Sequence, residues 1–126
     1  MPNYDDLLFS PPAPVANVTL RDPASSALLS EIPMLLDYGA DVTVIPQVAL
    51  DSLGVSIKSD EGVELMGFDG QTTISQIVRL DLIFQKKTFK GRFPVIEGQD
   101  WGIIGRDVLN HVVILLDGPR LTWEVQ

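Results

Sequence analysis

The sequence is dominated by short apolar segments, many of them rich in Val and Ile, that end at Gly, Pro or Asp. β-Branched side chains favour strands, and many short strands separated by turn residues are typical of a β-barrel or β-sandwich. Residues 47–53 have room for a single helical turn, and residues 106–111 for a short helix. The sequence therefore predicts an all-β domain. Its strands are expected at residues 15–20, 27–31, 32–36, 42–45, 55–58, 63–66, 72–78, 80–84, 89–96 and 112–116.

The length of 126 residues suits one compact domain. Residues 1–14 contain four of the nine prolines, and proline resists both helices and central strands. We therefore expect a proline-rich extended arm over residues 1–14 and a single domain over residues 15–126.

Composition excludes several functional classes. The chain has no cysteine, which rules out disulfides and cysteine-ligated zinc. Its 17 acidic and 9 basic residues give a net charge of −8, which argues against nucleic acid as the main partner. We find no basic leader ahead of an apolar run and no apolar stretch of about 18 residues. These features predict a cytoplasmic protein without a membrane partner.

Asp37 directly follows an apolar segment, and Gly39 comes two residues later. A glycine at this position can adopt a positive φ and turn its N–H toward the carboxylate, which would place Asp37 at a tight turn. An Asp at the start of a turn is more often structural than reactive. On this motif alone, a plain turn and a catalytic carboxylate both remain open.

A second motif lies at residues 101–109, where an apolar segment ends at Gly105 and Arg106 and Asp107 open a short helix. Together the two motifs resemble those of the retropepsins, the retroviral-type aspartic proteases that work as homodimers. Leu-Leu-Asp-Tyr-Gly-Ala-Asp is similar to the family's Leu-Leu-Asp-Thr-Gly-Ala-Asp active-site loop, and Ile-Ile-Gly-Arg-Asp-Val-Leu is similar to its helix entry. Residues 65–71, which include an Asp-Gly hairpin signal, occupy the place of the family's flap.

The resemblance implies a closed acid-protease-like barrel with a flap hairpin, one short C-terminal helix and a homodimer that hydrolyses peptide bonds. Two carboxylates about 3 Å apart cannot both ionise, so they share one proton. One then acts as a base toward water while the other polarises the scissile carbonyl. Asp37 of each copy would supply this pair across a two-fold axis, with residues 121–125 as a strand of the interface. The implied mechanism uses no cofactor and no metal.

Other positions follow from the resemblance one at a time. Tyr38, Gly39 and Ala40 would complete the active-site loop. Asp41 and Arg106 would form an ion pair that supports the loop and the dimer, with two unrelated surface charges as the alternative. The substrate would contact residues of the cleft and flap, namely Val44, Gly67, Phe68, Trp101 and Ile103. For Trp101 and Ile103, ordinary core packing is an equal alternative.

Tyr38 departs from the family pattern, which has Thr or Ser with a small hydroxyl that bonds across the dimer beneath the catalytic pair. A tyrosine hydroxyl lies about 6 Å further from the backbone, so it cannot make the same bond in the same place. The departure leaves an alternative function, a catalytically weak or inactive module that dimerises or binds peptides. A third class is a small all-β interaction domain unrelated to proteases.

The remaining polar residues offer weaker candidates. His111 is the only imidazole, and the chain has no Gly-x-Ser-x-Gly motif for a serine hydrolase. Lys86, Lys87 and Lys90 form too small a patch for nucleic acid. Arg21 is expected in an exposed turn.

Overall fold

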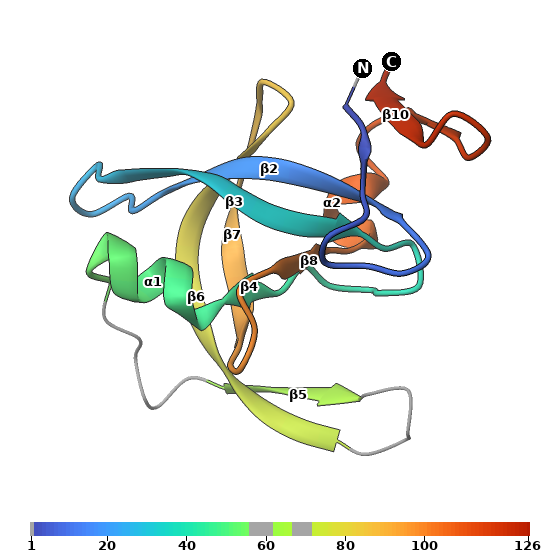
Figure 1. The fold of residues 1–126 in the computed structure, drawn as a ribbon. Helices are drawn as coiled ribbons and strands as arrows, with labels where there is room; N and C mark the ends of the chain where they lie inside the picture. The colour runs from blue at the N-terminus through green and yellow to red at the C-terminus, as the bar shows by residue number, and fades with distance from the viewer. Residues whose placement is uncertain (1, 56–61, 67–71) are drawn as a thin grey trace.

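The computed structural model describes residues 2–55, 62–66 and 72–126, and strands account for most of it (Figure 1). The all-β prediction is confirmed. The strands are β1 (Tyr4–Asp5), β2 (Ala13–Arg21), β3 (Leu28–Leu36), β4 (Ile45–Pro46), β5 (Gly62–Met66), β6 (Thr72–Phe84), β7 (Lys87–Ile96), β8 (Gly102–Ile104), β9 (Ile114–Asp117) and β10 (Thr122–Val125). The helices are α1 (Gln47–Leu53) and α2 (Arg106–Leu109). Neither of these two helices is long and apolar enough to cross a membrane.

The main sheet has the strand order β4-β7-β6-β2-β3-β8, with β1 added beside β2 and β5 beside β6. Its pairs are antiparallel except for β3–β8 and β4–β7, which are parallel. Among the described residues this is an open path and not the closed barrel that we expected. Its two ends meet only through an isolated bridge between Val44 and Ile103, because β4 and β8 contain just two and three residues.

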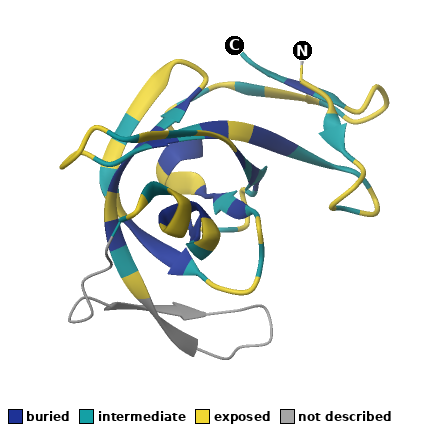
Figure 2. Cartoon of the chain, turned by 60° about the vertical axis from the view of Figure 1, so that its left-hand side comes forward, coloured by how far each residue is buried: buried dark blue, intermediate teal, exposed yellow. Residues whose placement is uncertain are grey.

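The core lies along the inner faces of three long strands. Where burial is described, buried apolar residues recur at every second position of these strands, as the two-residue period of a strand requires (Figure 2). These residues are Ala16, Val18 and Leu20 on β2, Ile32, Met34 and Leu36 on β3, and Val78, Leu80, Leu82 and Phe84 on β6. Trp123 of β10 stacks on Phe84 with ring centroids 6.2 Å apart, which fastens the separate β9–β10 hairpin to the core.

Both helices occur where the sequence allowed them. α2 buries Val108 and Leu109 against the core. α1 spans seven residues, longer than the single turn expected, and buries Ala49 and Leu50. Gly54 ends α1 in the left-handed conformation with φ of 73°, a position that favours glycine. In both cases, apolar burial on one side of the helix explains the helix better than local propensity does.

The N-terminal segment lies against the domain. β1 pairs with the start of β2 in antiparallel register, and Asn3 bridges to Thr122 of β10. The amide of Trp123 also donates to the carbonyl of Pro2 at 3.0 Å. The two ends of the chain are therefore side by side (Figure 1).

Arg21 is not in an exposed turn as expected, since it is the last residue of β2. Its Nε and Nη2 donate to Oδ2 of Asp81 at 2.8 and 2.6 Å. Asp81 lies on β6 and is only 4% exposed. A buried carboxylate requires such a partner, because its desolvation is otherwise uncompensated.

We expect Arg21→Ala to lower the free energy of unfolding by about 1–3 kcal/mol, because it leaves the Asp81 carboxylate buried without its two donors. Urea denaturation measures this. Arg120→Ala is the matched control, since Arg120 pairs with Asp117 at 3.7 Å and its side chain is 80% exposed. Equal losses for the two variants would contradict the structural role of the Arg21–Asp81 pair.

Candidate active site

Asp37 is held at the point where two parallel strands end together. β3 and β8 pair in parallel, with Leu36 beside Ile104. The amide of Asp37 continues this ladder by donating to the carbonyl of Ile104 at 3.0 Å. The backbone of Asp37 is therefore fixed by the sheet, and its half-buried side chain projects from the end of the strand into the loop.

The loop after Asp37 folds back onto its carboxylate. The amide of Gly39 donates to Oδ1 of Asp37 at 2.8 Å, and the amide of Ala40 donates to the Asp37 carbonyl at 3.2 Å. The expected N–H contact is thus present, but the positive φ expected at Gly39 is not. A Cβ at this position would lie 3.0 Å from Oδ1, so a larger residue would have to displace the carboxylate by a few tenths of an ångström. In the described part of the chain, no group donates to Oδ2 of Asp37, so that oxygen is available to a reaction partner.

A buried hydrogen-bond network connects this loop to α2. Thr43 is fully buried, and its Oγ1 donates to Oδ1 of Asp107 at 2.6 Å. The Thr43 amide donates to Oδ2 of the same carboxylate at 3.1 Å. The amide of Gly105 in turn donates to Thr43 Oγ1 at 3.1 Å. Thr43 therefore connects the segment after the Asp37 loop to the start of α2 through both its backbone and its side chain.

Residues 42–44 and residues 102–105 cross each other with their backbones in van der Waals contact. A Cβ on Gly105 would lie 2.6 Å from the carbonyl group of Val42, and one on Gly102 would lie 2.5 Å from the Val44 oxygen. Val44 and Ile103 exchange two backbone hydrogen bonds at 2.8 and 3.0 Å across this crossing. Only glycine fits at these two positions, which explains why the second motif contains both.

The ion pair expected between Asp41 and Arg106 does not form within this chain. Nη1 of Arg106 donates instead to the carbonyl of Tyr38 at 2.5 Å, and the Arg106 amide donates to the Ala40 carbonyl at 2.9 Å. Asp41 and Arg106 are both exposed, where an ion pair gains little over hydration. Arg106 thus contacts the Asp37 loop, but it binds the backbone of that loop and not the Asp41 carboxylate.

The residues predicted to contact substrate differ in how far they are buried. Val44 is buried at 7% exposure beside Ile103, and Trp101 is half-buried at the start of β8. The ring of Phe9 meets Trp101 edge-on with centroids 4.9 Å apart, a contact that the sequence analysis missed. The sequence signal for this contact was the presence of Phe9, an aromatic residue, in the proline-rich residues 1–14. The flap positions Gly67 and Phe68 lie outside the described residues.

Sequence analysis also assigned no role to Thr43 or Asp107. The available signal was a hydroxyl residue inside the β-branched run 42–45 and an acidic residue in the first turn of α2. The hydrogen bond between Thr43 and Asp107 could not be predicted without knowing that their segments cross, since 64 residues separate the two positions.

A family model described as retroviral aspartyl protease matches residues 12–117, which include the Asp37 loop, the crossing and α2. The chain belongs to the retroviral aspartyl protease family. Among solved structures, the EIAV protease complexed with the inhibitor HBY-793 is similar in fold, with a TM-score of 0.58 and 24% sequence identity. That similarity covers 79% of this chain and 86% of the EIAV chain. No curated protein matches the sequence.

We expect Thr43→Val to lower the free energy of unfolding by about 1–3 kcal/mol, because it removes the hydroxyl that donates to Asp107 Oδ1 and leaves the buried Gly105 amide without its acceptor, at nearly unchanged volume. Thr122→Val is the control, since the Thr122 hydroxyl is buried without a hydrogen-bond partner in the described part of the chain. That variant should lose no stability. Chemical denaturation of both variants tests the difference, and similar losses would contradict the proposed role of the network.

Proposed function

We propose that the protein is an aspartic endopeptidase whose active site consists of Asp37 from each of two copies of the chain. The observation that carries this proposal is the Asp37 carboxylate, with Oδ1 bound by its own loop and Oδ2 free of donors among the described residues. Membership of the retroviral aspartyl protease family supports the reaction class.

Among the residues that the structure describes, a single copy provides one such loop. Asp100-Trp101-Gly102 has the same Asp-x-Gly spacing, but Gly102 belongs to β8 and pairs with Met34. Its residues therefore continue a strand and do not fold back onto the Asp100 carboxylate. The second carboxylate of the pair must come from a second copy, which requires a two-fold axis beside Asp37.

In the proposed mechanism the two Asp37 carboxyl groups share one proton. The ionised carboxylate removes a proton from water, and the water oxygen adds to the scissile carbonyl carbon. The protonated partner donates its proton to the carbonyl oxygen at the same step. The carboxyl group that took the water proton then transfers it to the amide nitrogen, and the other carboxylate takes a proton from a hydroxyl of the tetrahedral diol. The C–N bond breaks as the carbonyl reforms, which releases an amine and a carboxylic acid and restores the shared proton. The Gly39 amide holds Oδ1 of the carboxylate in place throughout, and the Ala40 amide holds the backbone carbonyl of Asp37.

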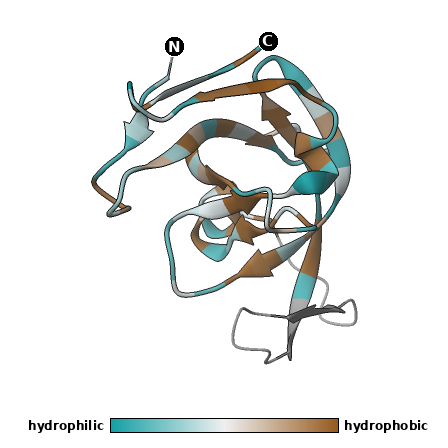
Figure 3. Cartoon of the chain, turned by 90° about the vertical axis from the view of Figure 1, so that its right-hand side faces the viewer, coloured by the Kyte–Doolittle hydropathy of each residue, from teal (hydrophilic) through white to brown (hydrophobic). Residues whose placement is uncertain are grey.

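The C-terminal hairpin supports the proposed dimer. β9 and β10 form a separate two-stranded sheet, and Figure 3 colours its residues by hydropathy. Four large apolar side chains on or beside this sheet are exposed to solvent. These are Val113, Leu115, Leu116 and Leu121, at 65%, 47%, 46% and 44% exposure. An exposed apolar group of this kind is typical of a protein–protein interface. We propose that it packs against the same hairpin of the second copy.

Tyr38 favours a second candidate function, a dimeric or peptide-binding module with little or no catalysis. Its ring is 44% exposed in the single chain, directly after the proposed catalytic residue. Two such rings would meet near the two-fold axis and could hold the Asp37 carboxylates too far apart to share a proton. A dimer that cleaves no member of a peptide library would support this alternative over the peptidase.

We expect Asp37→Asn to lower peptidase activity by about 10²–10⁴-fold, because the amide keeps the shape but removes the base and the shared proton. Peptide cleavage rates measure activity, and sedimentation equilibrium verifies that the dimer mass is unchanged. Asp51→Asn is the control, since Asp51 is an exposed residue of α1. Wild-type activity in Asp37→Asn would exclude the mechanism, and a monomer at every concentration of the wild type would exclude the shared site.

We expect Tyr38→Thr to tighten the dimer, because a small hydroxyl can again bond across the axis and each such neutral hydrogen bond contributes about 0.5–1.5 kcal/mol. The dimer dissociation constant from sedimentation tests this, and peptide cleavage should rise if loop geometry limits the rate. Val48→Thr is the control, since Val48 is a similarly exposed residue of α1 at 45%. A weaker dimer in Tyr38→Thr would show that the tyrosine ring is itself an interface contact.

A further inference from the structure

The strand that leads to Asp37 has a half-buried apolar face on the side away from the core. Leu35 lies two positions before Asp37 and directly opposite Ile103 of β8, so these side chains share one face of the parallel pair. Trp101, two positions before Ile103, continues the same face. All three apolar side chains are half-buried, whereas the alternate positions of both strands belong to the core. A peptide bound at Asp37 would therefore lie along apolar side chains.

Trp101 lies at a distance from Asp37 that an extended peptide spans in a few residues. Because Leu36 pairs with Ile104 in parallel register, Asp37 is level with Gly105, and Trp101 is four positions earlier on that strand. At about 3.3 Å per residue, this spacing corresponds to about 13 Å. The indole is therefore placed to contact a side chain near the scissile bond without touching the bond itself.

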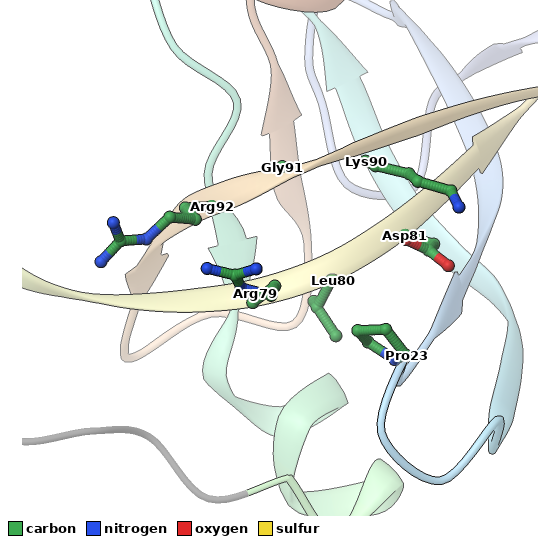
Figure 4. Close-up of a pocket in the computed structure, with 7 residues that line it drawn as sticks. All are labelled: Pro23, Arg79, Leu80, Asp81, Lys90, Gly91 and Arg92. Carbon is green, nitrogen blue, oxygen red and sulfur yellow. The ribbon is translucent and has the colours of Figure 1, made fainter.

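A pocket of about 320 Å³ lies elsewhere, on β6 and β7, and charged side chains line it, among them Arg79, Asp81 and Lys90 (Figure 4). These strands do not carry Asp37. A charged lining also disfavours an apolar side chain, because its charged groups would lose water without gaining a partner. The face of β3 and β8 is therefore the better match for the apolar side chains of a bound peptide.

Phe9 comes from a loop that the fold holds in place. β1 pairs with the start of β2, which closes residues 6–12 into a loop. Oδ1 of Asp5 accepts hydrogen bonds from the amides of Leu7 and Leu8 at 2.9 and 2.7 Å, and this fixes the turn directly before Phe9. Leu7 and Leu8 are exposed, whereas Phe9 is half-buried. The loop thus directs its aromatic ring toward the domain.

The ring of Phe9 meets the indole of Trp101 beside β8, with centroids 4.9 Å apart and an angle of 66° between the rings (Figure 1). Edge-to-face geometry of this kind is favoured for aromatic pairs. The backbone of Trp101 is held separately, because Nε2 of Gln99 donates to its carbonyl at 2.8 Å. Phe9 therefore acts on the part of Trp101 that the backbone does not fix, which is the direction of its ring.

We propose that Phe9 is a positioning residue for substrate specificity. It holds the indole of Trp101 toward the face that Asp37 shares, and Trp101 then favours a large apolar side chain of the peptide over a small one. The inference rests on the proposed function, since it requires that a peptide binds at Asp37. Phe9 acts through Trp101 and touches no reacting atom, so its effect falls on selectivity and not on bond cleavage.

The cleavage of two matched peptides tests the proposal. Mass spectrometry of a digested peptide library first gives the wild-type cleavage sequence. Two peptides of that sequence are then compared, with Phe or Ala at the position of strongest apolar preference. We expect Phe9→Ala to lower the Phe-to-Ala ratio of kcat/KM about 3–10-fold, mainly through KM, because the indole loses its edge contact. Phe9→Tyr keeps the ring and should keep the ratio.

This ratio separates positioning from a purely structural role. Both peptides meet the same variant, so any loss of folded or dimeric protein cancels in the ratio. A double-mutant cycle tests whether Phe9 acts through its partner. We expect Phe9→Ala to lower the ratio in the wild-type background and to leave it unchanged in a Trp101→Ala background. An equal effect of Phe9→Ala in both backgrounds would overturn the proposal.

Leu7→Ala is the matched control, since Leu7 belongs to the same loop and is 94% exposed. We expect it to leave the ratio unchanged. A wild-type ratio in Phe9→Ala, or the same fall in Leu7→Ala, would overturn the inference while peptide cleavage still supports the proposed function. An equal rise in kcat/KM for both peptides in Phe9→Ala would also overturn it, because the loop would then obstruct the site.

A binding measurement covers the case in which the wild type cleaves no peptide of the library. The probes are two hexapeptides with a non-hydrolysable statine at the centre, which differ only in Phe or Ala beside it. Calorimetric titration gives their affinities. Preference for the Phe peptide that falls about 3–10-fold in Phe9→Ala and not in Leu7→Ala would support the inference although the peptidase proposal fails. Absence of binding of either probe would overturn both.

Discussion

The structure depends on one buried crossing, where residues 42–44 pass directly over residues 102–105 with no side chain between the two backbones. Backbone groups brought together without water must satisfy one another or find side-chain partners. The bridge between Val44 and Ile103 meets part of this need, and the Thr43 hydroxyl with the Asp107 carboxylate meets the rest. The start of α2 and the position of the Asp37 loop follow from this crossing, because both segments leave it within a few residues.

The crossing positions the Asp37 carboxylate, whose Oδ2 accepts no hydrogen bond from the described residues. The Asp37 backbone extends the parallel pair β3–β8, and its Oδ1 is occupied by the Gly39 amide. A rigid loop of this kind costs little further ordering when a partner binds, which is the condition for efficient acid–base chemistry. The exposed apolar side chains of the C-terminal hairpin form the surface that we propose packs against a second copy. The proposed active site and the proposed interface thus both require a second copy of the chain.

Two arginines bind different kinds of partner in different parts of the molecule. Arg21 compensates the buried Asp81, and the pair crosses from β2 to β6. Arg106 is exposed and donates to a backbone carbonyl, so the charge of Asp41 is left to solvent. Burial explains the difference: a charge removed from water requires a partner, whereas an exposed charge is already stabilised by hydration. Position in a motif therefore predicted which residues lie near the loop better than it predicted their partners.

The sequence by itself determined the all-β class, both helix positions and the loop that presents Asp37, because these follow from local patterns of β-branched residues, turn residues and glycine. It also identified the family through two motifs, at residues 35–41 and 101–109. Only the tertiary structure decided that Thr43 bonds to Asp107, that Arg21 is paired and Arg106 is not, that Phe9 contacts Trp101, and that the sheet path remains open. Each of these depends on which distant segments meet and on how much water they exclude. A local pattern in one chain contains no information on either quantity.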